Sequence, residues 1–382
     1  MKILNINPYI NTKPINKTNH TKPISFTSLE QSEKASISTF KKLALQLEAK
    51  KLEKKAKTIV DDSKEVASYA VDRQEFFADK VKQSHDIQES AKVAYISAIA
   101  GLNSMDALAL TRLDEATGEP ITKITVENPT EKVSMRTLER ANGVLKMTDY
   151  RHDGTVRKVI FNNDETTISE VGTRGTNKVY YFDNGDNLSV YARNPKLKNG
   201  VYTADERFMF KDGNLLGWEE FSTIIYPQDT EKAFQRAEFK DDKLSGLSED
   251  WSRSNDRVIR AKDFYTFEDG IFYGYLKNYQ AEPMSGDGFS ASSMLRMTPD
   301  KKVSYFAQDI DLSGDAFGYF GKYFEYGKNN NPKYIQVGVD ILDGGMQAGK
   351  IFEVTNDKIA KCHFDAKIDG LGQIISRDQI EI

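Results

Sequence analysis

The chain has 382 residues, a formal net charge of −4 and 39% apolar residues, so most of it can build a core. No apolar run approaches the ~20 residues of a transmembrane helix, and residues 1–8 lack the apolar stretch of a Sec signal peptide. The single cysteine, Cys362, excludes an intrachain disulfide. We therefore expect a cytoplasmic protein without a transmembrane segment, with export by a route other than Sec as the alternative.

The composition changes sharply along the chain. All 25 glycines lie at or after Gly101, no proline occurs between Pro23 and Pro120, and 34 of the 41 aromatic residues lie from Tyr150 onward. A stretch free of glycine and proline favours helix, and a stretch rich in turn residues and aromatics favours strands. We expect an α+β fold in three parts. These are a disordered tail at 1–27, a coiled-coil-like helical region at 28–118 and an antiparallel β-hairpin repeat domain at 119–382.

The helical region carries a seven-residue apolar pattern. The seam consists of Leu45, Leu52, Ile59 and Val66, and alanines follow four residues behind most of them. This spacing predicts a narrow apolar stripe on a helix. The run Asp61-Asp62-Ser63 followed by Glu65 resembles a helix end and a new N-cap. The sequence therefore predicts separate helices over about 29–60, 62–82 and 86–101 rather than one continuous rod.

Charge is also unevenly distributed. Residues 1–57 carry twelve lysines and four glutamates, a net charge of +8, which leaves −12 for the remainder. Part of this excess lies on the first expected helix, at Lys50, Lys51, Lys54, Lys55 and Lys57. The simplest interpretation is a solvated helix face. A contact with an acidic partner, or docking on a membrane or nucleic acid, is the alternative, with nucleic acid the least expected partner.

An internal repeat is the strongest signal in the sequence. Four segments align without gaps and begin at Phe182, Phe210, Phe239 and Phe267, at intervals of 28, 29 and 28 residues. Weaker copies continue at Met297, Tyr326 and Val354. Each strong copy places Asp-Gly, Asn-Gly or Asp-Asp between apolar residues, and these dipeptides tolerate the positive φ of a tight hairpin turn. The pattern predicts a long antiparallel β-meander of hairpins about 28 residues long.

These segments resemble the bacterial MORN-variant repeats, which share a Tyr/Phe-x-Asn/Asp-Gly-x-Leu core. The resemblance covers residues 182–188, 210–216, 239–244 and 267–272. It implies an array of β-hairpins used for binding or scaffolding, and it brings no catalytic residues with it. The N-terminal third of the chain lies outside this resemblance.

Three short motifs partly match known sites. Residues 344–350 fit G-x-x-x-x-G-K, but Ile351 replaces the Ser or Thr that binds Mg²⁺, and a strand is expected to follow. Asp309-x-Asp311-x-Ser313 resembles half of a calcium loop without its final acid. Cys362 and His363 are adjacent, so on a strand they point to opposite faces and do not share a metal. We expect no cofactor, no metal site and a buried Cys362.

Five aromatic residues of the β-region form the candidate binding surface: Trp218, Trp251, Tyr273, Tyr275 and Tyr279. Exposed on a broad sheet, such rings would make a platform for sugars or peptides. The simpler alternative is that they form the apolar face covered by the N-terminal helices.

Two functions remain open from the sequence. The first is a non-enzymatic interaction or scaffold protein that presents a repetitive β-surface to a protein or glycan, with self-association through the helices as a further option. The second is a hydrolase that acts on an extended polymer across the β-face, although no residue pattern identifies its catalytic group.

Overall fold

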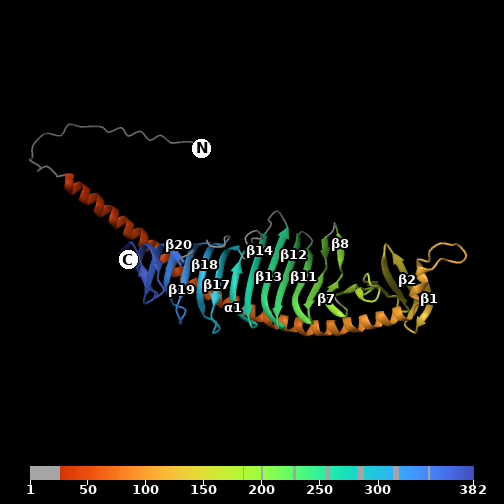
Figure 1. Cartoon of the computed structure of the whole chain (residues 1–382). Helices are drawn as coiled ribbons and strands as arrows, with labels where there is room; N and C mark the ends of the chain where they lie inside the picture. The colour runs from red at the N-terminus through yellow and green to blue at the C-terminus, as the bar shows by residue number, and fades with distance from the viewer. Residues whose placement is uncertain are drawn as a thin grey trace, which may run out of the picture.

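The computed structural model describes residues 26–183, 185–198, 201–226, 229–254, 259–281, 288–312, 318–342 and 345–382. The expected tail at 1–27 therefore lies almost wholly outside the described residues. One long helix comes first, followed by a short 3₁₀ helix and then strands only. Figure 1 shows the helix running along the whole row of strands.

The helices are α1 (Phe26–Asn103) and η1 (Ala107–Thr111). The first strands are β1 (Lys123–Thr130), β2 (Val133–Ala141), β3 (Val144–Arg151), β4 (Val156–Phe161), β5 (Ile168–Arg174), β6 (Lys178–Asp183), β7 (Asn187–Arg193), β8 (Lys196–Lys198) and β9 (Val201–Thr203). The middle strands are β10 (Glu206–Lys211), β11 (Asn214–Tyr226), β12 (Asp229–Lys240), β13 (Lys243–Ser254), β14 (Ile259–Glu268), β15 (Ile271–Lys277) and β16 (Gln280–Ala281). The last are β17 (Phe289–Met297), β18 (Val303–Leu312), β19 (Gly318–Tyr326), β20 (Pro332–Leu342), β21 (Gly345–Thr355), β22 (Lys358–Ile368), β23 (Ile374–Ile375) and β24 (Asp378–Glu381).

The expected division into three helices, with breaks at residues 61–63 and between 82 and 86, is wrong, because α1 continues through both places without interruption. Asp61 lies on the exposed side, where its carboxylate pairs with Lys64 at 2.9 Å. Ser63 is buried, and its hydroxyl donates to the carbonyl of Val60 at 2.8 Å, so it does not cap a new helix. Polar residues on the exposed side of a packed helix do not end it when the opposite side stays in contact with the sheet.

The strands form one long antiparallel meander, as the turn pattern predicted. Among the described residues, 22 strands belong to a single sheet, and β8 and β9 form a separate two-stranded hairpin between β7 and β10. Successive strands of the meander pair side by side along the chain, from β1 with β2 to β21 with β22. At the far end, β22 pairs with both β23 and β24.

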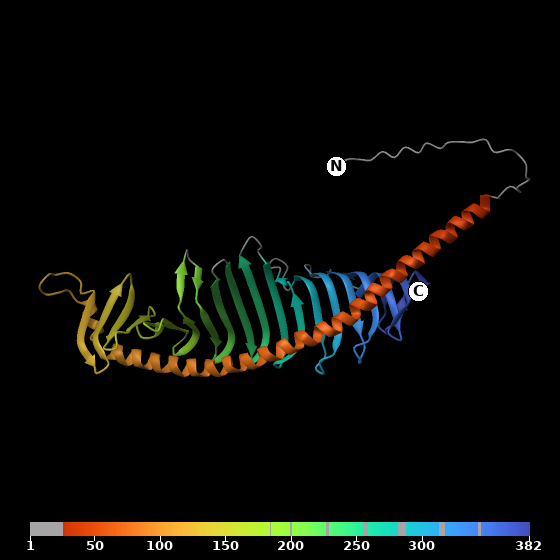
Figure 2. The same cartoon turned by 180° about the vertical axis from the view of Figure 1, so that it is seen from behind.

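The helix crosses the strands in the reverse order of the chain (Figures 1 and 2). Its early part contacts β22 and β18, and its late part contacts β7 and β5. At one end Glu48 pairs with Lys350 of β21, and at the other Gly101 accepts a hydrogen bond from Arg136 of β2. The helix between these points is about 80 Å long at 1.5 Å per residue. The sixteen strand spacings from β21 to β2 amount to about 77 Å.

This near match explains the sequence pattern of the helix. One heptad of helix is about 10.5 Å long, and two strand spacings are about 9.6 Å. Residues seven apart on α1 therefore lie on the same side of the helix and face the sheet at intervals of about two strands. A buried column follows this period: Ala49, Ala56, Ser63, Ala70, Phe77, Ser84, Ala91 and Ala98. The predicted seam residues Leu45, Leu52 and Ile59 are buried beside it and face strands, not a second helix.

A second apolar cluster lies on the sheet face turned away from α1. It includes Ala307, Ile310 and Phe320, which are buried without contact with the helix cluster. The backbone of Asp309, with φ +54°, is left-handed, and Gly338 and Asp365 have the same conformation on alternate strands. Such a left-handed residue interrupts the alternation of its strand without shifting the pairing register, since Gln308 pairs with Lys322 and Ile310 with Phe320. As a result, residues three apart, such as Ala307 and Ile310, share this second cluster.

Candidate functional site

Trp218 lies on the sheet face that α1 covers, so its ring is not part of an open platform. Its side chain is 0% exposed and packs edge to face against Phe77, with ring centroids 5.3 Å apart. The indole N–H donates to Glu206 at 2.9 Å, and Lys80 of the helix reaches the same carboxylate at 2.6 Å. The Lys80 ammonium also lies 4.8 Å from the Trp218 ring centroid. This buried polar contact joins the helix to β10 and β11.

The structure does not bring the five predicted aromatic residues together on one surface. Tyr275 is half-buried on the helix side and donates to Asp263 at 2.9 Å. Tyr273 is half-buried, with the Arg296 guanidinium 5.0 Å from its ring centroid. Tyr279 lies on the opposite face, in the second apolar cluster. Trp251 belongs to β13, and its side chain lies outside the described residues.

A polar network lies under the helix beside Tyr275. Glu249 of β13 accepts hydrogen bonds from the hydroxyl of Tyr69 at 2.8 Å and from Gln235 at 3.2 Å. Arg73 of the helix lies 3.3 Å from the same carboxylate. Burial raises the pKa of Glu249 above its usual value, and Asp263 on the neighbouring strand raises it further. The network holds α1 on the sheet, and it includes a pair of carboxylates, because Glu249 and Asp263 are directly opposite in register.

Most of the predicted basic run is exposed on the helix. Lys50, Lys51 and Lys54 are exposed and have no ion-pair partner among the described residues. Lys55 is half-buried, with its ammonium 5.6 Å from the ring centroid of Phe306. Lys57 is exposed at the rim of a pocket between helix and sheet. Three of the five lysines therefore form a free basic surface.

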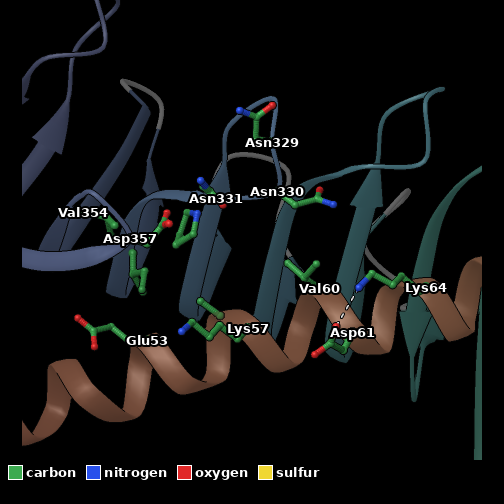
Figure 3. A pocket seen from close by; sticks show the side chains of 13 residues that line it. Glu53, Lys57, Val60, Asp61, Lys64, Asn329, Asn330, Asn331, Val354 and Asp357 are labelled. Atoms are coloured by element: carbon green, nitrogen blue, oxygen red, sulfur yellow. Dashed lines mark hydrogen bonds and ion pairs between the residues drawn. The ribbon is translucent and has the colours of Figure 1, made fainter.

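The pocket beside Lys57 has a volume of about 440 Å³ and is open to solvent. Figure 3 shows helix side chains, Glu53 and Lys57 among them, below the turn that carries Asn329 and Asn330. Glu53 is already occupied, since it accepts the N–H of Ile359 at 2.8 Å. Asn330 accepts the N–H of Val303 at 2.7 Å, which fixes the turn. The pocket is therefore lined by amides, by the ammonium of Lys57, by the carboxylate of Asp357 and, on the helix, by the Asp61–Lys64 ion pair.

A second cavity of about 620 Å³ lies where the helix ends against β2, β3 and β4. Two buried guanidiniums, Arg136 and Arg157, share the carboxylate of Asp149, with N–O distances of 2.6 and 2.5 Å. Arg136 also donates to the carbonyl of Gly101 and to the hydroxyl of Ser104 at the helix C-terminus. The partial negative charge of the helix end helps to balance the second guanidinium. This cluster fastens the end of α1 to the sheet.

The ionisation of this cluster follows from its surroundings. Burial by itself would raise the pKa of Asp149, but the Arg136 hydrogen bond and the two positive charges hold it below its usual range. Burial lowers the pKa of Arg157. The sequence analysis did not identify this cluster. Strand alternation could have identified it, because a charged residue two positions from a buried apolar residue lies on the same face of its strand. The three pairs are Arg136 and Leu138, Asp149 and Met147, and Arg157 and Val159.

The first two of these short motifs lie mainly within strands. Lys350 lies in β21 and pairs with Glu48 at 2.6 Å, and Ile351 continues the same strand, as expected. Asp309 lies within β18, not in a loop, and residues 313–317 and 343–344 are outside the described part.

The adjacent pair Cys362 and His363 occupies opposite faces of β22. Cys362 is fully buried, and burial raises the pKa of its thiol to about 11. His363 contacts Glu353 and Ser376, each at 3.2 Å. The expectation of a buried cysteine is therefore confirmed.

No group of three or more His, Cys, Asp or Glu side chains among the described residues is arranged to hold a metal ion. None of the described helices combines the length and apolar character needed to cross a membrane.

Comparison with known proteins gives little guidance. No family model and no curated protein matches the chain. Among solved structures, a porin-like protein from Bacteroides uniformis is similar over 68% of this chain and 96% of that chain, at 9% identity and a TM-score of 0.11. A similarity at this level carries no argument about fold or function.

Proposed function

We propose that the protein is a non-enzymatic scaffold that presents the outer face of its sheet to an extended protein or glycan partner. The outer face is the one turned away from α1. The main support is a stack of half-buried rings on that face, in which Tyr279 lies between Phe264 and Phe289. The ring centroids are 5.4 and 5.7 Å apart. The Lys262 ammonium lies 5.7 Å from the Tyr279 ring centroid and adds a cation to the surface.

A second aromatic pair continues this surface on earlier strands. Phe221 and Phe234 are directly opposite in register on β11 and β12, with ring centroids 5.8 Å apart. The Phe221 side chain remains 49% exposed although it is large and apolar. Partly exposed rings on a rigid sheet can stack on sugar rings or contact apolar side chains of a peptide.

The scaffold is built, in this proposal, from one repeated hairpin of about 28 residues. Its support is a register shift that recurs beside the hairpin turns. The shifts fall just before Phe182, Phe210, Phe239, Phe267, Met297, Tyr326 and Val354. These are the residues at which the aligned sequence segments begin. The same bulge in each hairpin would give the sheet a uniform twist and repeat its outer surface at regular spacing. A relationship to MORN-variant repeats stays a prediction.

A binding screen with a surface variant tests the scaffold function. The full chain is screened against glycan and peptide arrays, and hits are measured by calorimetry with wild type and with Tyr279→Ala. The loss of one stacking ring should weaken binding about tenfold. Tyr150→Ala removes a ring that is also partly exposed but belongs to a distant strand, and it should leave binding unchanged. Equal binding by wild type and Tyr279→Ala would contradict the proposal.

The alternative function is a hydrolase that uses Glu249 and Asp263. The observation in its favour is the cross-strand pairing of these carboxylates, together with the raised pKa of Glu249. Both residues lie beneath α1, however, and the Glu249 side chain is only 12% exposed and already bound to Tyr69 and Arg73. Turnover in a glycan and peptide hydrolysis screen that disappears in Glu249→Gln would favour this alternative over the scaffold.

A further inference from the structure

The N-terminal part of α1 extends beyond the sheet and carries exposed apolar side chains. Figure 2 shows this end of the helix leaving the row of strands near the C-terminus of the chain. Residues 38–44 are all exposed, and burial of the helix begins at Leu45. Phe40, Leu43 and Leu47 are 73%, 52% and 55% exposed. Three large apolar side chains on one helix end are more than the scattered exposure that a surface normally shows.

These apolar residues share one side of the helix with free lysines. At 100° per residue, Phe40, Leu43 and Leu47 project opposite the buried residues Leu45 and Ala49. The next residues on this outer side are Lys50, Lys51 and Lys54, all exposed. Over the 14 residues from Phe40 to Lys54, this basic apolar stripe is about 21 Å long.

Among the described residues, no acidic side chain compensates the charge of the stripe. Between residues 38 and 60 the chain has seven lysines and two acidic residues, Glu48 and Glu53. Both glutamates turn inward, Glu48 to Lys350 and Glu53 to the N–H of Ile359. Their negative charges therefore lie on the sheet side of the helix and do not neutralise the lysines on its outer side.

We propose that the basic apolar stripe docks on an anionic lipid surface. Lysines beside exposed apolar side chains on one helix face are the combination that binds the headgroup region of such a surface, where charge attracts and apolar groups insert. Duplex nucleic acid would use the lysines but leave Phe40 and both leucines in water. This docking is independent of the outer-face binding proposed above, and it fits the expected cytoplasmic location, where the membrane leaflet is anionic.

Acidic residues on the rest of the exposed side of α1 limit the lipid contact to the N-terminal end of the helix. From residue 61 to residue 89 it carries eight exposed acidic residues: Asp61, Asp62, Glu65, Asp72, Glu75, Asp79, Asp86 and Glu89. Exposed Lys64 and Lys82 pair with Asp61 and Asp79. An anionic surface repels this stretch, so the protein attaches by one end of its helix and the sheet points away from the lipid.

Vesicle flotation of the full chain tests the docking. The probe is vesicles of phosphatidylcholine with 30% phosphatidylserine, compared with vesicles of phosphatidylcholine alone. Wild type should float with the anionic vesicles only, and less so as salt is raised. The lysine variant combines Lys50→Gln, Lys51→Gln and Lys54→Gln. It should partition about a hundredfold more weakly, because each lysine near such a surface strengthens binding about fivefold. Phe40→Ser, Leu43→Ser and Leu47→Ser together should weaken it at least tenfold.

The matched control removes three other exposed lysines of the same helix, Lys64→Gln, Lys82→Gln and Lys92→Gln. This variant should bind within about twofold of wild type. All substituted side chains are exposed, so circular dichroism should show the same fold in every variant. Four outcomes overturn the proposal. The first is equal binding to both vesicle types, and the second is binding as strong as wild type by either stripe variant. The third is binding to duplex DNA without binding to vesicles. The fourth is that the chain does not bind vesicles but forms a dimer, and that the serine variant abolishes this dimer.

Discussion

The hydroxyl of Tyr326 donates a hydrogen bond to the backbone carbonyl of Ala56 at 3.0 Å, across 270 residues of chain. Both residues are buried, 4% and 2% exposed, at the contact between β19 and α1. The carbonyl of Ala56 belongs to a helix, so it already accepts an intrahelical bond and uses its second lone pair for Tyr326. The contact fixes one turn of the helix to one strand and thereby sets their mutual register.

Tyr326→Phe should destabilise the protein by about 1 kcal/mol, since it removes this hydrogen bond while keeping the ring. Urea unfolding followed by circular dichroism measures the change. Tyr150→Phe, at a partly exposed ring on β3, is the control and should change the free energy of unfolding by less than about 0.5 kcal/mol. An unchanged midpoint for Tyr326→Phe would show that the bond contributes nothing in solution.

Ala70→Leu should lower stability by about 1–3 kcal/mol, because the buried column has no room for a larger side chain. Ala70 is 0% exposed between the helix and the strands. The substitution would push the helix away from the sheet over more than one turn. Ala78→Leu places the same side chain on the exposed side of the helix and should be nearly neutral. If both variants unfold at the same temperature, the helix does not pack on the sheet as described.

Asp149→Asn should cost about 3–5 kcal/mol at neutral pH, because two buried guanidiniums then lack their shared carboxylate. The folded-state pKa of Asp149 is below its unfolded value. Its contribution is therefore present above the unfolded pKa and is lost as the pH falls through the folded pKa. The difference between wild type and variant should shrink in acid, measured by thermal unfolding from pH 7 to pH 3. Asp72→Asn, at an exposed helix position, should follow wild type at every pH.

Alkaline pH should destabilise the protein through its buried and half-buried tyrosines. Burial raises the pKa of Tyr275 and Tyr326 well above the ordinary value of 10. The folded state then holds these protons more tightly than the unfolded state. Stability is therefore complete below pH 10 and decreases as the pH rises above it. Tyr275→Phe should make this decrease less steep, while Phe272→Leu, which removes no hydroxyl, should leave its slope unchanged in urea titrations at pH 8 to 11.

Part of the fold could be predicted because its signals are local. The change from a segment without glycine or proline to one with regular Asx-Gly turns predicted the helix and the meander. The heptad seam at Leu45, Leu52 and Ile59 identified the buried side of the helix. Its partner could not be predicted, since a period of seven residues fits a second helix and two strand spacings almost equally well. The break at Asp61 and Asp62 was wrong because packing decides which residues are exposed, and the sequence pattern does not show which part of the chain packs on the helix.

The candidate site was less predictable for a similar reason. Trp218 lies in β11 and Tyr279 follows β15, and the face on which each lies depends on bulges in the strands, which are set by pairing. Nothing in the sequence states which face the helix covers. The positive charge of residues 1–57 was visible, but its freedom was not, because it depends on Glu48 and Glu53 turning toward β21 and β22.

Seven residues of helix are about as long as two strand spacings, and this limits which insertions and deletions the fold tolerates. A hairpin added to or lost from the meander moves every later strand by about 10 Å relative to the helix. Unless the helix gains or loses a heptad where it crosses that hairpin, the helix and strand residues beyond the hairpin no longer lie opposite each other. The contacts of Tyr326 and Lys350 with the helix are examples. Relatives of different size should therefore differ by paired units, seven residues early in the chain and one hairpin later in it.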